Sequence, residues 1–174
     1  VVLITNNDGN NVGDANPEAL IIDGPGEYEK QGIAVKGILS YHDNVGGKER
    51  GLNTIYVLKA EDMTICHLGD LGQKELTNEQ VEQIGDVDVL MIPIGGNFTI
   101  NYEGAMDVIS KIEPKIIIPM HYKIKDLKVD LDGPEKPHLI GRQPGGVIHG
   151  APHVAMRVEV EACDLTTSVG SQGS

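Results

Sequence analysis

The sequence contains no tryptophan, one phenylalanine and two cysteines among its 174 residues. Two cysteines in unrelated contexts form neither a disulfide framework nor a Cys-x-x-Cys metal pair, so a reducing, cytoplasmic location is expected. No apolar run approaches the roughly 20 residues that a membrane-spanning helix needs, and no signal peptide is visible. These absences exclude a disulfide-rich secreted protein and predict that the chain has no membrane partner.

Positive charge is also scarce. The 14 lysines and arginines stand against 26 aspartates and glutamates, and the formal net charge is -12. Nucleic-acid affinity comes chiefly from clustered Lys and Arg, and the basic residues form no such cluster. No nucleic-acid partner is therefore expected. An acidic surface favours solubility and remains compatible with a local cation site.

Short apolar segments between turns rich in glycine and proline make up most of the chain. Strands are predicted at residues 1–5, 19–22, 33–39, 54–58 and 63–66, the last two as a hairpin. A capping box at Thr77 and Gln80 predicts a helix with Val81 and Ile84 inward. It is followed by a strand at 87–92 and a strand at 115–118. Between these two strands the helical spacing of Ala105, Val108, Ile109 and Ile112 predicts a second helix. The alternation indicates an α/β fold, with two sheets face to face and helices outside.

The last segment is different. Residues 137–152 are rich in Gly, Pro and His and have no periodicity, whereas 154–160 alternate apolar and charged residues and predict one strand. The expected organisation is a domain over residues 1–136 and an irregular tail over 137–174. The tail histidines are not expected to form a metal site, because Gly150 and Pro152 interrupt the helix that would pair them; they are His138, His149 and His153.

Three ligand-type residues each follow a predicted strand: His42, Asp70 and His121. The ends of strands are where α/β folds place their sites, and imidazole and carboxylate suit zinc, manganese or iron. A bound metal lowers the pKa of water and supplies a nucleophile near neutral pH. A lone histidine at a strand end is more often an ordinary hydrogen-bonded residue, but the three together predict a metal site.

The stretches around these residues resemble the metallo-β-lactamase superfamily, in the branch of ascorbate-6-phosphate lactonase and related metal-dependent hydrolases. They are IDGPGEYE (22–29), YHDNVGG (41–47), ICHLGDLG (65–72), IPIGGNFT (92–99) and IPMHY (118–122). The resemblance implies a four-layer αβ/βα sandwich. It also implies that His42 is a metal ligand, that Asp70 can bridge two metals and that His121 belongs to the second metal.

The family's strongest signature, Thr-His-x-His-x-Asp-His, is altered here. The matching residues 5–11 read TNNDGNN and contain no histidine. Without gaps, Asp8 takes a histidine position and can still ligate a metal, while a gapped alignment places it at the family's Asp. A third interpretation is an Asx-rich turn around Asp8. The chain opens on Val1 rather than Met and the family's first strands are absent, so a start upstream is expected.

Other residues near these motifs have two interpretations each. His67 either orients a ligand or caps a strand end, and Asp43 either bonds an imidazole or is a solvated loop carboxylate. Backbone amides of Gly95 and Gly96 either hold a substrate oxygen or form a tight turn. Tyr122 either stabilises an oxyanion or packs as an ordinary aromatic residue.

The leading hypothesis is a hydrolase with one divalent metal ion, zinc or manganese, held by His42, Asp70 and His121 and by Asp8. Its water would attack an ester, lactone or phosphoester in a small-molecule substrate. The alternative is a non-catalytic binding or oligomerisation module that has lost the full metal site. A third hypothesis is that the chain is part of a larger gene product. An unpaired sheet edge would favour a homo-oligomer.

Overall fold

The computed structural model describes residues 1–6, 19–123 and 131. The chain divides into two compact units, Val1–Pro137 and His138–Ser174, and all described residues belong to the first. Asp8, the three tail histidines (His138, His149 and His153) and the strand predicted at 154–160 lie outside the described residues.

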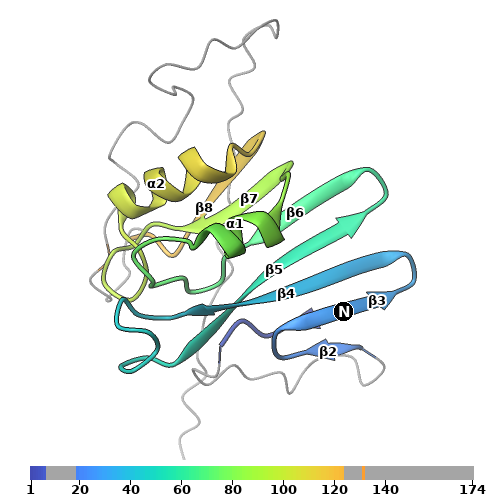
Figure 1. Cartoon of the computed structure of the whole chain (residues 1–174), viewed down its shortest axis with the longest axis horizontal. Coiled ribbons are helices and arrows are strands. Elements are labelled where there is room, and N and C mark those ends of the chain that lie inside the picture. Colours follow the sequence, from blue (N-terminus) through green and yellow to red (C-terminus); the bar gives the residue numbers. More distant parts are fainter. Residues whose placement is uncertain (7–18, 124–130, 132–174) are drawn as a thin grey trace, which may run out of the picture. The chain divides into compact units, whose positions relative to one another are not determined.

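The first unit is built on a six-stranded mixed sheet in the order β3-β4-β5-β6-β7-β8 (Figure 1). Neighbouring strands from β3 to β6 are antiparallel, and the pairs β6-β7 and β7-β8 are parallel. Consequently β4, β6, β7 and β8 run in one direction and end at the same edge of the sheet. The strands are β3 (Gly26–Lys30), β4 (Ile33–Tyr41), β5 (Leu52–Ala60), β6 (Met63–His67), β7 (Val89–Pro93) and β8 (Ile116–Met120).

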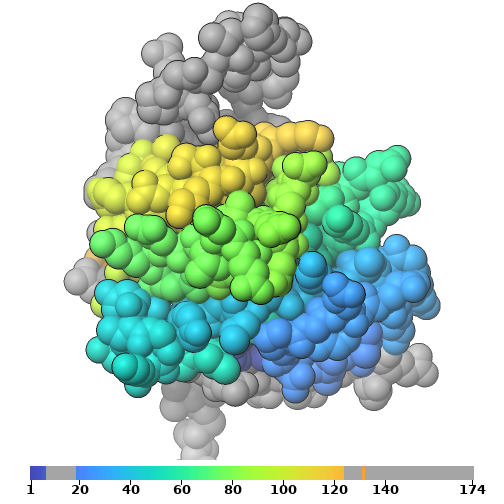
Figure 2. All heavy atoms as spheres, in the orientation of Figure 1, coloured from blue at the N-terminus to red at the C-terminus, as the bar shows by residue number. Residues whose placement is uncertain are grey.

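Two helices, α1 (Asn78–Ile84) and α2 (Tyr102–Ile112), cover much of one face of this sheet (Figures 1 and 2). The predicted capping box is confirmed, because Gln80 N–H donates to Thr77 Oγ1 at 3.1 Å and Thr77 N–H to Gln80 Oε1 at 2.9 Å. Ile84 is buried as predicted, but Val81 is only half-buried. Gln80 is buried instead, because its amide donates to Leu39 O at 2.8 Å.

Helix α2 buries the four residues expected from its periodicity: Ala105, Val108, Ile109 and Ile112. Within the described residues, no helix has both the length and the apolar character to cross a membrane. The α/β class predicted from the sequence is confirmed.

A second, two-stranded parallel sheet pairs β1 (Val2–Leu3) with β2 (Ile21–Ile22). It packs on a buried cluster of Ile22, Val35 and Tyr56. Both strands are shorter than the sequence predicted. Strand β3 was not predicted, because its sequence GEYEK is largely polar and none of its residues is fully buried.

The buried hydroxyl of Tyr56 fixes this second sheet. It lies 2.8 Å from Ile4 O and 3.1 Å from Ile22 O, and burial raises its pKa to about 12. Tyr56→Phe removes the donor and leaves two carbonyls with weaker partners. We expect the free energy of unfolding to fall by about 1–2 kcal/mol, measured by urea denaturation. An unchanged midpoint would show that water replaces the hydroxyl without cost.

Candidate functional site

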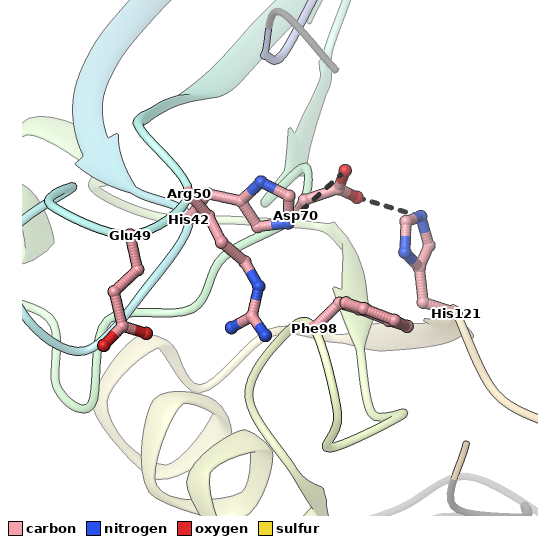
Figure 3. Close-up of a pocket in the computed structure, with 6 residues that line it drawn as sticks. All are labelled: His42, Glu49, Arg50, Asp70, Phe98 and His121. Carbon is pink, nitrogen blue, oxygen red and sulfur yellow. Dashed lines mark ion pairs between the residues drawn. The ribbon is translucent and has the colours of Figure 1, made fainter. Parts of the chain in front are cut away.

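The three ligand-type residues predicted from the sequence lie together at one edge of the six-stranded sheet. His42 follows β4 directly, Asp70 lies three residues after β6, and His121 follows β8 directly. His42 Nε2 lies 3.9 Å from Asp70 Oδ2, and His121 Nε2 lies 3.1 Å from Asp70 Oδ1 (Figure 3). The Asp70 carboxylate therefore stands between two imidazoles, each of which faces a different oxygen.

The three side chains differ in their access to solvent. His42 is 4% exposed, the Asp70 side chain 21% and the His121 side chain 44%. Solvent therefore reaches His121 more readily than His42, which is buried.

His121 has a left-handed backbone, with φ of 51°. Such a conformation costs a residue other than glycine about 1–2 kcal/mol, and strain of this kind often occurs at functional sites. Gly95 makes room for it, because a Cβ at Gly95 would overlap the carbonyl oxygen of His121. The absence of a side chain at Gly95, the first glycine of the Gly-Gly pair, therefore allows the close approach of the His121 backbone.

Asn53 holds the backbone of Asp70. It is fully buried at the start of β5, and its Oδ1 accepts the Asp70 N–H at 2.9 Å. Its Nδ2 donates to Ser40 Oγ at 2.7 Å and to Leu68 O at 2.9 Å. Sequence analysis missed Asn53. The available signal was an amide in the apolar run LNTIYVL, since a buried amide requires hydrogen-bond partners.

Asn6 occupies the first histidine position of the altered signature and lies beside Asp70. Its Nδ2 donates to Asp70 Oδ2 at 2.5 Å, the oxygen that His42 also faces. The backbone before it is fixed, because Thr54 N–H donates to Thr5 O at 2.7 Å. The Asn6 amide N–H therefore faces the Asp70 carboxylate, at a position where the superfamily signature has a histidine.

The donor set fits a divalent cation in type but not in number. Imidazole nitrogen and carboxylate oxygen are suitable ligands on both sides of Asp70. Among residues 1–6, 19–123 and 131, however, no group of three or more His, Cys, Asp or Glu side chains forms a set that could hold a metal ion. His42, Asp70 and His121 therefore do not close the expected three-ligand centre by themselves.

The loop between β4 and β5 is organised by Asp43. Asp43 is 2% exposed. Its carboxylate accepts four backbone N–H groups, those of Val45 (2.9 Å), Gly47 (2.7 Å), Glu49 (2.9 Å) and Arg50 (2.8 Å). Burial opposes its ionisation, but these four donors prevail and lower its pKa to about 2. Asp43 is therefore neither the partner of an imidazole nor a solvated carboxylate, and both interpretations were wrong.

A pocket of about 440 Å³ opens beside Asp70, within the size range of small-molecule sites. Its described lining is His42, Glu49, Arg50, Asp70, Phe98 and His121 (Figure 3). Sequence analysis missed Glu49, Arg50 and Phe98. Phe98 is the only phenylalanine in the sequence and follows a Gly-Gly-Asn turn, which was a usable signal for an exposed aromatic residue.

The remaining expected residues, His67, Gly95, Gly96 and Tyr122, are not among the described lining residues of this pocket. His67 Nδ1 accepts the Gly69 N–H at 3.0 Å and caps the turn that leads to Asp70. Burial, followed by the nearby His121, lowers its pKa. The Gly96 N–H already donates to Ile100 O at 3.3 Å, which argues against its role in holding a substrate oxygen. Tyr122 is half-buried and is not among the described lining residues.

Cys66 lies away from solvent and is not expected to be a ligand. It is fully buried in β6, and burial raises the pKa of its thiol to about 12. Among the described residues it also belongs to no group of three or more side chains that could hold a metal ion.

Comparison with known proteins gives three informative similarities. Residues 1–121 match the family model described as "Beta-lactamase superfamily domain". A UPF0173 metal-dependent hydrolase of Pyrococcus horikoshii is 30% identical over 71% of this chain and 55% of its own length. One from Thermoplasma acidophilum is 34% identical over 63% of this chain and 49% of its own.

A solved structure agrees with these sequence matches. It is a putative Zn-dependent hydrolase of the metallo-β-lactamase superfamily from Thermotoga maritima, 43% identical to this chain, with a TM-score of 0.58. The match covers 66% of this chain and 55% of that one. The chain thus spans about half the length of the curated relatives it matches.

Proposed function

The chain belongs to the metallo-β-lactamase superfamily and has its α/β fold, and from this premise we propose that it is a metal-dependent hydrolase. The observation that carries the proposal is the placement of two imidazole Nε2 atoms, 3.9 and 3.1 Å from the two oxygens of one carboxylate. Its relatives' description as metal-dependent hydrolases supports the same conclusion.

In the proposed site His42, Asp70 and His121 would hold one divalent cation, and their imidazole nitrogens and carboxylate oxygens are suitable ligands for it. Asp8 is the proposed source of a further ligand. The ion, zinc or manganese, would supply Lewis acidity that makes water a better nucleophile near neutral pH and polarises an ester, lactone or phosphoester. A single ion is proposed, since residues 5–11 lack the histidines that the superfamily signature supplies for a second one.

The chain's own residues would orient the ligands and shape the cavity. Asn53 fixes the backbone of Asp70 from below, and the close approach of Gly95 fixes that of His121. Both act on the backbone, so the main chain that carries these two ligands would be in place before a cation binds. Preorganisation of this kind limits the entropy lost on binding.

The test is metal binding by the full chain. After treatment with a chelator, titration with Zn²⁺ and with Mn²⁺ in a calorimeter is expected to give about one ion per chain. Asp70→Asn and His121→Ala should each weaken binding by about tenfold or more. Asp62→Asn, in the exposed turn between β5 and β6, is the matched control and should leave it unchanged.

The Asn6–Asp70 hydrogen bond favours the alternative, a non-catalytic module, because a neutral amide satisfies the carboxylate without a cation. Binding of neither metal, by a chain whose thermal unfolding remains cooperative, would support this alternative and overturn the hydrolase proposal. If metal binds, turnover of nitrophenyl acetate, a simple lactone and bis-nitrophenyl phosphate would distinguish the three substrate classes.

A further inference from the structure

Arg50 is the only lysine or arginine among the six described residues that line the pocket. Figure 3 places its guanidinium between Glu49 and Phe98, below His42. Within the described part of the chain, the guanidinium forms no ion pair with a carboxylate. In a chain of formal charge -12, a guanidinium without a carboxylate partner in a pocket is a candidate for binding a ligand.

The position of Arg50 is fixed at both ends of the residue. Its backbone N–H donates to Asp43 Oδ2 at 2.8 Å, as part of the four-donor arrangement that orders this loop. The guanidinium carbon lies 5.4 Å from the centre of the Phe98 ring, which is within the range of a cation–π interaction. Two loops, one between β4 and β5 and one between β7 and α2, therefore hold the cation in place.

We propose that Arg50 and Phe98 form a subsite for an oxyanion group, a carboxylate or a phosphate, that the substrate carries apart from the bond to be cleaved. The proposal rests on the hydrolase function proposed above, because it assigns the substrate class of that same site. A guanidinium presents a planar fork of N–H donors that matches both oxyanions. The Phe98 ring lies beside the guanidinium, and both side chains line the pocket.

The charges around the subsite make Arg50 the residue that is expected to attract an anionic group. The other charged residues of the lining, Glu49 and Asp70, are carboxylates, which would repel an anionic ligand. A ligand with one anionic end is therefore expected to orient that end toward Arg50. Its remaining part then lies toward Asp70 and the two imidazoles, where hydrolysis is proposed.

The experiment measures anion binding in the metal-free full chain, so that it does not depend on metal or turnover. Inorganic phosphate and acetate are titrated separately at low ionic strength while the Arg50 Nε–Hε resonance is followed by NMR. We expect a saturable shift with at least one anion, and the anion that binds more tightly identifies the substrate's charged group. Arg50→Gln should weaken binding of that anion by about tenfold or more.

Lys48→Gln is the matched control, since it removes one positive charge from the same loop at an exposed position outside the pocket lining. It should change the dissociation constant less than about twofold. Arg50→Lys, which keeps the charge but loses the planar fork, should bind with intermediate affinity. The proposal is overturned if neither anion shifts the Arg50 resonance, or if Lys48→Gln weakens binding as much as Arg50→Gln. Neither result bears on whether the chain binds a metal.

Discussion

Replacing Gly72 with alanine is expected to lower the free energy of unfolding by about 3 kcal/mol and to displace His42. A Cβ at Gly72 would overlap the carbonyl group of His42 and lie 2.7 Å from Asp43 N. Because these are backbone atoms, neither the Gly72 turn nor the segment after β4 can move aside easily. Gly72 N–H donates to Tyr41 O at 2.9 Å, and His42 N–H donates to Gly51 O at 3.1 Å. Relief of the overlap must separate the end of β4 from the turn that carries Asp70.

The stability change is measured by urea denaturation, with Gly24→Ala as the control. Gly24 has no atom within 4 Å of an added Cβ, so its substitution should change stability by less than about 0.5 kcal/mol. A Gly72→Ala protein with the unfolding midpoint of the unchanged chain would refute the close approach of the two segments. Since this contact joins His42 to the Asp70 turn, the folded fraction of the variant should also bind metal more weakly.

Local sequence patterns predicted the helices well because the determining interactions are local. The capping box at Thr77 and the periodicity of α2 both involve neighbours within four residues. Strand β3 was missed because its alternation is clear only against its partner, where Tyr28 pairs with Val35 in β4. Val81 was wrongly placed inward because the hydrogen bond from Gln80 to Leu39, 41 residues away, outweighs its greater hydrophobicity.

The same distinction applies to the site. His42, Asp70 and His121 could be expected together because parallel strands end at a common edge, a rule that needs only the strand assignments. The position of Arg50 could not be predicted in this way, because it depends on how the Asp43 carboxylate binds four backbone N–H groups of one loop. Asn53 likewise acquires its role only through packing, which brings Ser40, Leu68 and Asp70 around one amide.

The effect of the altered signature on metal binding can be tested by restoring its first histidine. Asn6→His is expected to raise zinc affinity by about tenfold or more, which corresponds to ~1.4 kcal/mol or greater. Asn6 Nδ2 already lies 2.5 Å from Asp70 Oδ2, the oxygen that His42 faces. Imidazole and amide both carry a nitrogen one bond beyond Cγ, so the substitution replaces an N–H donor with a nitrogen that can accept a metal. His42, Asp70 and the new side chain would then supply three ligands on one side of the carboxylate.

Asn78→His is the matched control, because it adds the same side chain at the exposed start of α1. It should leave the Zn²⁺ dissociation constant unchanged, which separates a ligand effect from non-specific binding by an added imidazole. If Asn6→His binds zinc no more tightly than the unchanged chain, the amide is not what limits the site. Residues other than the one at position 6 would then have to supply the missing ligands. If its affinity does rise, the carboxylate and imidazole geometry at the sheet edge is already competent, and the absence of a histidine at position 6 is one physical limit on metal binding.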